Sequence, residues 1–467
     1  MYKVPDEFYK RIHHVRPRFK SNVENVLIFM ATRLYDIGVL EKETFKEKMN
    51  EQIRDFPGNK DATEKTINNW RTEIVSLFGL ILSDENQSHA GLRAAELATD
   101  QDLIKFFKTF LFSFQYPGGH VKDKEIIDLV EKRVRFQPAR KILELLEYAK
   151  LNGDDSYLTK GEATHCIFND LRVTTGEEPV AKTWSRIKRN RDQNVEYDTS
   201  GDIVRYAGDI LDYMEIANLL YSRGNRFFMN VNEIEAIEVF LKESEFFGKY
   251  SLLEGEISSN PNLVKQYRNE WFGFVNRDLT VYNFETNITS YLCETQEELI
   301  EKQKESVMEF QTILGTDVGI TTYEIGTRGE AIIIDHEKTK LIKAGENKLV
   351  HLVNFIPTGL GVGYDIQSFE IDGSELRKYI EIKTTVSSRG VSFNSFHITK
   401  NEWRTAKSVK DRYYVYRMQI SQHQRKLFVL KNLYELVSEK KIQLIEARDG
   451  YDVRFLESNG IYEEMFI

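Results

Sequence analysis

Cysteine is nearly absent from this chain, which has only Cys166 and Cys293 among its 467 residues. Two thiols so far apart in sequence cannot supply a disulfide framework or a thiolate zinc cluster, so both are expected to be small buried hydrophobes. The nine histidines show no clustered zinc spacing either. The sequence therefore argues against both disulfide-rich and zinc-stabilised architectures.

Long apolar runs are also missing. No stretch of about 20 apolar residues occurs, and residues 1–20 are polar and basic without an apolar signal-like core. We therefore expect a cytoplasmic protein with no membrane segment. The phosphate-binding pattern Gly-x-x-x-x-Gly-Lys-Ser/Thr is missing too, which argues against a nucleotide cofactor.

The composition that remains is ordinary for a globular protein, with 41% hydrophobic and 29% charged residues. At about 100 to 200 residues per domain, the length predicts two to four domains. The net charge of −9 argues against a generic cationic coat. It does not exclude nucleic acid, because a protein can bind a duplex through a local basic surface.

The first 150 residues have the apolar spacing of helices. Within them, residues 61–71 have the pattern of the second helix of a helix-turn-helix, with Ile67 and Trp70 facing inward. A capped surface helix without DNA contact is the alternative. The candidates for DNA contact on this helix are Thr66, Asn68, Asn69 and Arg71.

A second candidate recognition element lies at residues 157–191. Thr159 and Glu162 predict a capping box at the start of one helix, and a turn at 176–179 separates it from the next. Trp184 and Ile187 form the inward stripe of that next helix, and its other positions are rich in cations. A solvated charged face is the alternative. The candidates for DNA contact are Lys182, Thr183, Ser185, Arg186, Lys188, Arg189 and Arg191.

Residues 203–240 read as helix, tight turn at Gly224, short strand and helix, which suits a winged-helix module. Phe227 and Met229 would lie in the wing or its core. This order also resembles the multi-winged DNA-recognition regions of some restriction endonucleases. The sequence shows no internal repeat. Further on, residues 287–314 predict a long amphipathic helix.

Residues 379–385 alternate as in a β-strand. Glu381 and Lys383 then share one face, about 6 to 7 Å apart, while Ile380 and Ile382 enter the core. An acid and a base so placed suit Mg²⁺, which takes hard oxygen ligands while a nearby ammonium orients water. Alone, however, an acid-x-Lys string is typical of a solvated strand face.

Further blocks in the last third of the chain favour a nuclease. Gly329-Glu330 and residues 363–369, 379–385, 396–403 and 413–417 resemble, in this order, the PD-(D/E)XK restriction-endonuclease-like superfamily. The branch is that named after the plant protein NO VEIN, whose domain recurs in bacterial restriction and defence proteins. Tyr364 stands where the superfamily pattern has proline, and this branch accepts such a replacement. The resemblance implies metal binding by Asp365, Glu381 and the Ile382 carbonyl, catalysis by Lys383, and a helix acid at Glu330.

This site imposes a condition on the hairpin that joins its two strands. The Asp-Gly pair at 372–373 predicts the turn. A two-residue turn would set Asp365 opposite Ile380, on the wrong face from Glu381. The site therefore requires an odd offset, such as a three- or five-residue loop through residue 375, or a bulge.

Together these patterns predict a multidomain protein with an α-helical and winged-helix N-terminal region and a C-terminal α/β restriction-endonuclease-like domain with a mixed central sheet. Residues 1–150 would form a helical DNA-recognition domain and 151–255 a winged-helix-like one. Residues 256–314 would form a linker and connecting helix, and 315–467 the nuclease domain.

The function implied is a Mg²⁺-dependent, sequence-specific endonuclease of restriction or defence, with Mn²⁺ able to substitute. Its substrate would be double-stranded DNA, and a homodimer would cut both strands. The alternatives are a modification-dependent or RNA-directed nuclease, a DNA-binding regulator with an inactive nuclease-like domain, and a non-catalytic interaction protein.

Overall fold

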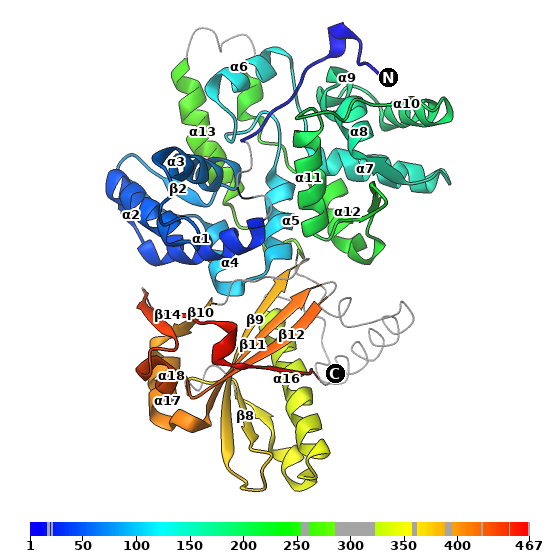
Figure 1. Cartoon of the computed structure of the whole chain (residues 1–467). Helices are drawn as coiled ribbons and strands as arrows, with labels where there is room; N and C mark the ends of the chain where they lie inside the picture. The colour runs from blue at the N-terminus through cyan, green and yellow to red at the C-terminus, as the bar shows by residue number, and fades with distance from the viewer. Residues whose placement is uncertain are drawn as a thin grey trace. The chain divides into compact units, whose positions relative to one another are not determined.

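The computed structural model describes residues 1–15, 19, 22–253, 261–284, 323–356, 362–387, 395–421, 424–447 and 449–465. By their contacts the residues form two units, Met1–Phe284 and Glu285–Ile467 (Figure 1). The predicted helix at 287–314 and Cys293 lie outside the described residues. Among the helices that are described, none has both the length and the apolar content needed to cross a membrane. The finer division at residues 150 and 255 stays a prediction.

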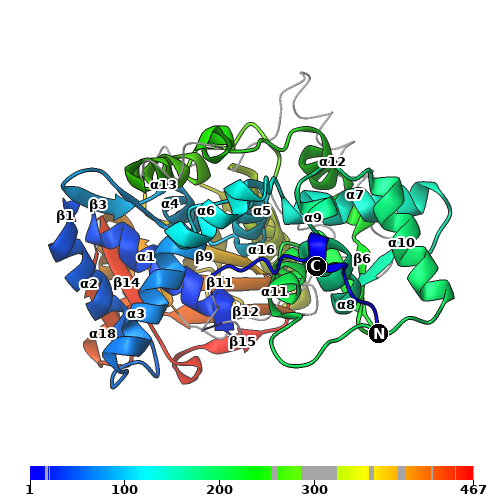
Figure 2. The same cartoon turned by 90° about the horizontal axis from the view of Figure 1, so that it is seen from above.

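The N-terminal unit is mainly helical. Helices α7, α8 and α10 gather with strand β6 at one end of it (Figure 2). Its helices are α1 (Val23–Ile37), α2 (Lys42–Asp55), α3 (Glu64–Thr72), α4 (Leu92–Asp100), α5 (Leu103–Ser113), α6 (Asp123–Glu131), α7 (Pro138–Leu151), α8 (Lys160–Glu162), α9 (Leu171–Thr174), α10 (Val180–Asp192), α11 (Arg205–Ile216), α12 (Ile234–Lys242) and α13 (Pro261–Val275), with π-helical segments η3 (Glu73–Leu77) and η4 (Ala163–Phe168).

Two small antiparallel sheets in this unit share one strand order. In each, a first strand is followed by helices and a hairpin, and the first strand pairs with the last strand of the hairpin. We call residues 23–100 the first module and residues 138–242 the second module. The strands are β1 (Leu40–Glu41), β2 (Ile81–Ser83) and β3 (Gln87–Ala90), in the order β1-β3-β2, and β4 (Tyr157–Thr159), β5 (Leu220–Arg223) and β6 (Arg226–Met229), in the order β4-β6-β5.

Helix α5 joins the cores of the two modules, since every one of its residues is buried. Phe110 contacts Phe78, which follows η3 in the first module, and Tyr213 on α11 in the second, with ring centroids 5.2 and 5.8 Å apart. Lys108 on the same helix forms a buried ion pair with Glu233 at 2.7 Å. Aromatic pairs of this kind add about 0.5 to 1.5 kcal/mol beyond the area they bury, so α5 holds the modules as one folded unit.

Asn276, directly after α13, is bonded to the first module. Its side chain donates to the Gly79 carbonyl at 2.8 Å and accepts from the Arg93 amide at 3.2 Å. A Cβ at Gly91 would lie 2.1 Å from the Asn276 Oδ1, so only glycine fits at that position. The chain thus returns from the second module to close the first.

The C-terminal unit contains a six-stranded sheet in the order β15-β12-β11-β9-β8-β7, with β9 and β11 parallel and the other neighbours antiparallel. The predicted mixed sheet is confirmed. A second sheet has the order β10-β14-β13. The elements are α16 (Tyr323–Lys343), β7 (Asn354–Phe355), β8 (Ile366–Phe369), β9 (Arg377–Ser387), β10 (Ser395–Thr399), α17 (Lys400–Val409), β11 (Tyr413–Ser421), β12 (Gln424–Lys431), α18 (Leu433–Ser438), β13 (Gln443–Glu446), β14 (Gly450–Arg454) and β15 (Ile461–Glu463).

Different helices cover the two faces of the large sheet (Figure 1). Helix α17 packs on one face through a core that includes Trp403 and Val415. Helix α16 lies on the other face, where a Cβ at Gly329 would be 2.6 Å from the Thr384 Oγ1 and 3.2 Å from the Met418 Cε. Glycine therefore allows α16 to approach the sheet closely at the residue before Glu330.

Candidate active site and nucleic-acid interface

The hairpin of β8 and β9 has the odd offset that the site requires. Ile366 lies opposite Ile380, and a hydrogen bond from the Glu370 amide to the Leu376 carbonyl at 2.9 Å closes the loop at residues 371–375. This pairing has the offset that the site requires, and it ends at Ile366, because the Asp365 amide donates to the Ile380 carbonyl at 2.9 Å. The charge of Asp365 acts on the Glu381 carboxyl, so the two acids lie within electrostatic reach of each other. The predicted condition on the hairpin is therefore met.

The two carboxylates of the hairpin are held in a buried setting. The Asp365 carboxylate accepts a hydrogen bond from the Ile382 amide at 2.8 Å. Glu381 is only 3% exposed, whereas Ile382 is half-buried, so the prediction that Ile382 enters the core holds only in part. Burial raises the pKa of both carboxyl groups, and the nearby Lys383 opposes this rise.

Lys383 lies between two carboxylates. Its Nζ is 2.7 Å from the Glu381 Oε1 and 3.0 Å from the Glu402 Oε2. Burial alone would lower the pKa of this ammonium, but Glu381, Glu402 and Asp365 together raise it. Lys383 is therefore a fixed positive charge and a hydrogen-bond donor at neutral pH.

Glu402 is a member of this site for which the sequence suggested no role. It completes a capping box at the start of α17, since its carboxylate accepts from the Thr399 amide at 3.1 Å and its amide donates to the Thr399 Oγ1 at 3.2 Å. Against the effect of burial, the contacts with Lys383 and Thr399 lower the pKa of Glu402. The Thr-x-x-Glu spacing could have predicted the cap, but not the contact with a lysine on another strand.

Glu330 on α16 belongs to the same charge cluster. Its side chain is half-buried, and burial together with the nearby Asp365 charge raises its pKa to about 7. The structure therefore brings the predicted helix acid within electrostatic reach of the predicted metal ligand.

The donor set fits a hard divalent cation. Three carboxylates, those of Asp365, Glu381 and Glu402, act on the ammonium of Lys383, and Glu330 is within electrostatic reach of Asp365. A cluster in which acids outnumber the neighbouring base favours a cation. Within the described ranges, no three His, Cys, Asp or Glu side chains form a group that could hold a metal ion by themselves. Mg²⁺ needs only one or two carboxylates, because water and phosphate complete its shell, and Mn²⁺ accepts the same ligands.

Helix α3 carries the first set of predicted DNA contacts. Asn68 is exposed, while Thr66 and Asn69 are half-buried. Arg71 donates to Asn50 at 2.8 Å and to Asn68 at 2.7 Å, so its guanidinium is already oriented by the protein. The two apolar residues predicted to face inward, at 67 and 70, are buried.

Helix α10 lacks the continuous basic face that its sequence suggested. Arg186 is buried and donates to both carboxylate oxygens of Glu178, at 2.8 and 2.7 Å. Thr183 is also buried and donates to Glu178 at 2.7 Å, and Arg191 donates to Glu162 at 2.6 and 3.0 Å. These three side chains have structural partners inside the module, which corrects the expectation that they face solvent.

The rest of the predicted set on α10 is exposed. Lys188 pairs with Asp154, and the Ser185 hydroxyl donates to the Ala181 carbonyl at 2.7 Å. Among the described residues, the exposed cations Lys182 and Arg189 make no hydrogen bond or ion pair through their side chains. Helix α10 therefore keeps a basic surface, but one with fewer cations than its sequence suggested.

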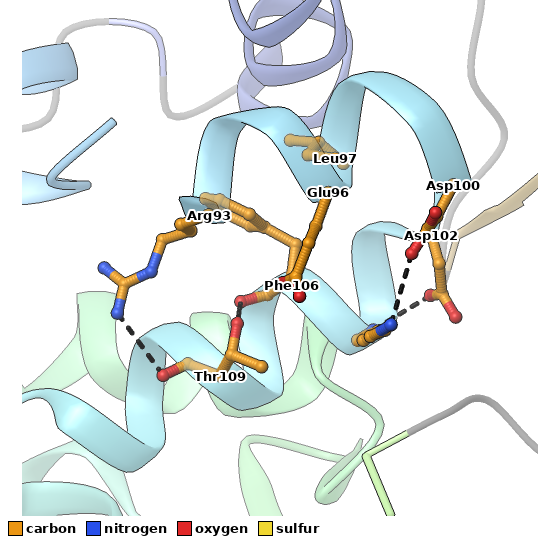
Figure 3. Close-up of a pocket in the computed structure, with 8 residues that line it drawn as sticks. Arg93, Glu96, Leu97, Asp100, Asp102, Phe106 and Thr109 are labelled. Atoms are coloured by element: carbon orange, nitrogen blue, oxygen red, sulfur yellow. Dashed lines mark hydrogen bonds and ion pairs between the residues drawn. The ribbon is translucent and has the colours of Figure 1, made fainter. Parts of the chain in front are cut away.

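A pocket between α4 and α5 has a different character (Figure 3). Lys105 pairs with Asp100 at 3.2 Å, its amide donates to Asp102 at 2.8 Å, and Arg93 donates to the Phe78 carbonyl at 2.9 Å. Its cavity volume of about 10 Å³ is far below the roughly 300 Å³ at which small-molecule sites begin. Its lining is Arg93, Glu96, Leu97, Asp100, Asp102, Lys105, Phe106 and Thr109, and we assign it a structural role.

Residues 2–272 match the family described as restriction endonuclease BpuJI, N terminal. The chain belongs to this family. Residues 329–430 match the family described as protein NO VEIN, C-terminal, which confirms the NO VEIN branch of the resemblance seen in the last third of the sequence. A BpuJI-type N-terminal region and a NO VEIN-type C-terminal region thus occur in one chain.

A solved structure is similar to part of this BpuJI-family chain. It is the crystal structure of pyrene- and phenanthrene-modified DNA in complex with the BpuJ1 endonuclease binding domain. The two share 23% sequence identity with a TM-score of 0.51, over 59% of this chain and all of that one. At this identity the likeness concerns the fold. No curated protein matches the chain.

Proposed function

We propose that this protein is a Mg²⁺-dependent, sequence-specific DNA endonuclease of the restriction type. The observation that carries the proposal is the contact of Lys383 with Glu381, next to Asp365 on the same hairpin. Membership of the BpuJI N-terminal family supports a restriction role. The similar crystal structure, in which an endonuclease binding domain is in complex with DNA, supports DNA as the substrate of this chain.

The proposal includes a named fold for the C-terminal unit and for each of the two modules. The C-terminal unit is assigned to the PD-(D/E)XK type because its mixed sheet carries the acid pair on adjoining strands. The two modules are assigned as winged helices because each has a hairpin whose last strand pairs with a strand that precedes the helices.

In the proposed mechanism, Asp365 and Glu381 would hold Mg²⁺ or Mn²⁺ together with the Ile382 carbonyl. Such an ion would supply Lewis-acid polarisation of the phosphate and would lower the pKa of a water. Lys383 donates a hydrogen bond that orients the attacking water, and its charge offsets the negative charge that builds on the phosphate. Glu402 keeps Lys383 in place when Glu381 is engaged by the ion.

DNA recognition is proposed for the exposed polar positions of α3 and α10. Lysine and arginine suit phosphates, whereas asparagine suits the edges of bases. Thr183, Arg186 and Arg191 are left out, since they are bonded within the second module. The retained positions are Thr66, Asn68, Asn69 and Arg71 on α3, and Lys182, Ser185, Lys188 and Arg189 on α10.

The test is incubation of plasmid DNA with the purified protein, with Mg²⁺ or with EDTA, followed by sequencing of the ends. We expect cutting at defined sites only with Mg²⁺. We also expect a loss of at least about 100-fold for Asp365→Ala and for Lys383→Met, because charge stabilisation of this kind is worth that much. Retained duplex binding and an unchanged melting temperature would show that both variants fold.

Each alternative predicts a different outcome of this experiment. Binding of duplex DNA without any cutting would favour a regulator with an inactive nuclease-like domain. Cutting restricted to methylated plasmid, or to RNA in a parallel incubation, would favour the modification-dependent or RNA-directed nuclease. Cutting that persists in EDTA or in Asp365→Ala would overturn the proposed site.

A further inference from the structure

One face of the small sheet in the second module carries a row of aromatic rings. Strand register sets Tyr157 opposite Phe228, and Phe228 opposite Tyr221, so the three side chains lie on the same side. The Tyr157 and Phe228 centroids are 5.7 Å apart, and those of Tyr221 and Phe228 are 5.4 Å apart with planes at 17°. Tyr221 is 42% exposed, and the other two rings are half-buried. The row is therefore a partly open apolar surface.

A second row on the same face is basic. Arg226 lies opposite both Thr159 and Arg223, on either side of it. Arg223 and Arg226 are exposed, and among the described residues neither makes a hydrogen bond or ion pair through its side chain. The guanidinium groups of Arg226 and Arg191 lie 4.4 and 3.8 Å from the centroid of the Tyr157 ring. We call these two rows together the wing face.

The turn of this hairpin places its arginines at the tip. Gly224 and Asn225 have φ angles of 57° and 61°, as in the two-residue turns that fit tight hairpins. The opposite side of the sheet, with Leu158 and Phe227, is buried in the module. One side of the sheet thus packs into the core of the module. On the other side, the wing face, the arginines at the tip of the hairpin are exposed.

The first module shows that this surface is not required by the topology. Its sheet has the same strand order, yet the pairs on its more exposed side are Glu41 with Gln87 and Leu82 with His89. That side has no aromatic row and no arginine. Cross-strand aromatic pairs stabilise a sheet by about 0.2 to 1 kcal/mol each, but this gain does not account for two exposed arginines, Arg223 and Arg226, that no carboxylate among the described residues pairs with.

We propose that the wing face binds single-stranded DNA, by stacking unpaired bases on its rings and guanidinium planes and attracting the phosphates with its arginines. Aromatic side chains and arginine are the combination that holds unpaired bases without sequence preference. An acidic peptide would need the arginines but not the rings, and an apolar helix would need the rings but not the arginines. This activity goes beyond the recognition and cutting of duplex DNA.

The test measures binding of the full chain to a fluorescein-labelled 12-nucleotide oligothymidine by fluorescence anisotropy, in EDTA at low salt. We expect Tyr221→Ala to weaken binding about ten-fold, as for loss of one stacking partner. Tyr221→Phe should bind like the wild type, and Arg226→Lys should lie between, since it keeps the charge but loses the planar group. Gln87→Ala, at an exposed site on the first module, is the matched control.

A 12-base-pair duplex measured in parallel separates this proposal from the proposed nuclease function. Tyr221→Ala should change duplex affinity by less than about two-fold, since a paired base cannot stack on the ring, and should leave plasmid cutting unchanged. The inference is overturned if the wild type does not bind the oligothymidine, if Tyr221→Ala binds it normally, or if duplex and single strand lose affinity equally. Circular dichroism of each variant shows that the effect is not due to unfolding.

Discussion

At the scale of single residues, the most informative contact is that of Lys383 with two glutamates. Glu381 belongs to the same strand, but Glu402 comes from the first turn of α17, where it also caps the helix. The position of the lysine is therefore tied to the start of a helix as well as to its own strand. In the proposed mechanism, Glu402 contacts the catalytic lysine from the start of a helix and is therefore a positioning residue.

Substituting Glu402 separates the lysine contact from the cap. Glu402→Gln keeps an oxygen that can accept from the Thr399 amide but removes the charge, so we expect cleavage to fall about 10- to 100-fold with little loss of stability. Thr399→Ala should instead cost about 1 kcal/mol of unfolding free energy through the lost cap. Cleavage assays and thermal unfolding of both variants check this. Wild-type cleavage by Glu402→Gln would contradict the role of Glu402.

Glu330 should make the stability of the metal-free protein depend on pH. Burial and Asp365 raise its pKa from 4.5 in the unfolded chain to about 7, so between these values the folded state holds a proton that the unfolded state has lost. The free energy of unfolding should therefore fall as pH rises through this window. In EDTA, Glu330→Gln should show a shallower fall of melting temperature between pH 4.5 and 7.5. An unchanged slope would show that Glu330 titrates normally.

At the scale of elements, the close approach of α16 to the sheet sets the position of Glu330. Gly329→Ala would place a methyl group 2.6 Å from the Thr384 Oγ1, so either the helix or the strand must shift. We expect a loss of about 1 to 3 kcal/mol in unfolding free energy, together with reduced cleavage. Both can be measured by denaturant unfolding and plasmid cutting.

Thr384→Ala in the same chain is the control for this prediction. It removes the hydroxyl that the new methyl would meet, so the double variant should recover part of the lost stability and activity. If Gly329→Ala has the same effect in the wild type and in Thr384→Ala, the methyl group does not act through the Thr384 hydroxyl. This result would contradict the steric explanation.

Elements with strong local signals could be predicted from the sequence. The alternation at 379–385, the capping box at Thr159 and Glu162, and the inward stripe of α10 all agree with the structure. The odd hairpin offset was deduced as a requirement of the site, and the five residues of the 371–375 loop satisfy it. The first small sheet was missed because its strands have only two to four residues, too few to show a period of two.

Partners distant in sequence explain the remaining differences. Arg186 and Arg191 looked like part of a basic face because the acids that pair with them, Glu178 and Glu162, precede the helix. A helix pattern shows which side is polar but not what packs against it. The contact of Glu402 with Lys383 could not be predicted for the same reason. It depends on where helix α17 packs against the sheet before the chain enters β11, next to β9.

At the scale of the whole molecule, one proposed site per chain can cut one strand, so cutting of both strands should require two chains. We expect nicked plasmid to accumulate at low protein concentration, and linear plasmid to form with a rate that rises more steeply than in proportion to concentration. Adding Asp365→Ala protein to the wild type should increase the share of nicked product, because mixed dimers have one working site. Linear product without a nicked intermediate, unaffected by the inactive variant, would contradict the dimer proposal.

Asn276 has a practical consequence for anyone who wishes to produce the N-terminal unit alone. The match to the BpuJI family stops at residue 272, four residues short of this asparagine. Beyond it, Phe284 makes an edge-to-face contact with Phe112, with centroids 5.1 Å apart. A fragment trimmed to the family limit would leave the Gly79 carbonyl and the Arg93 amide without their bonding partner. A fragment that extends to residue 284 should therefore be more stable, and more suitable for titrations and crystallisation, than one that ends at residue 272.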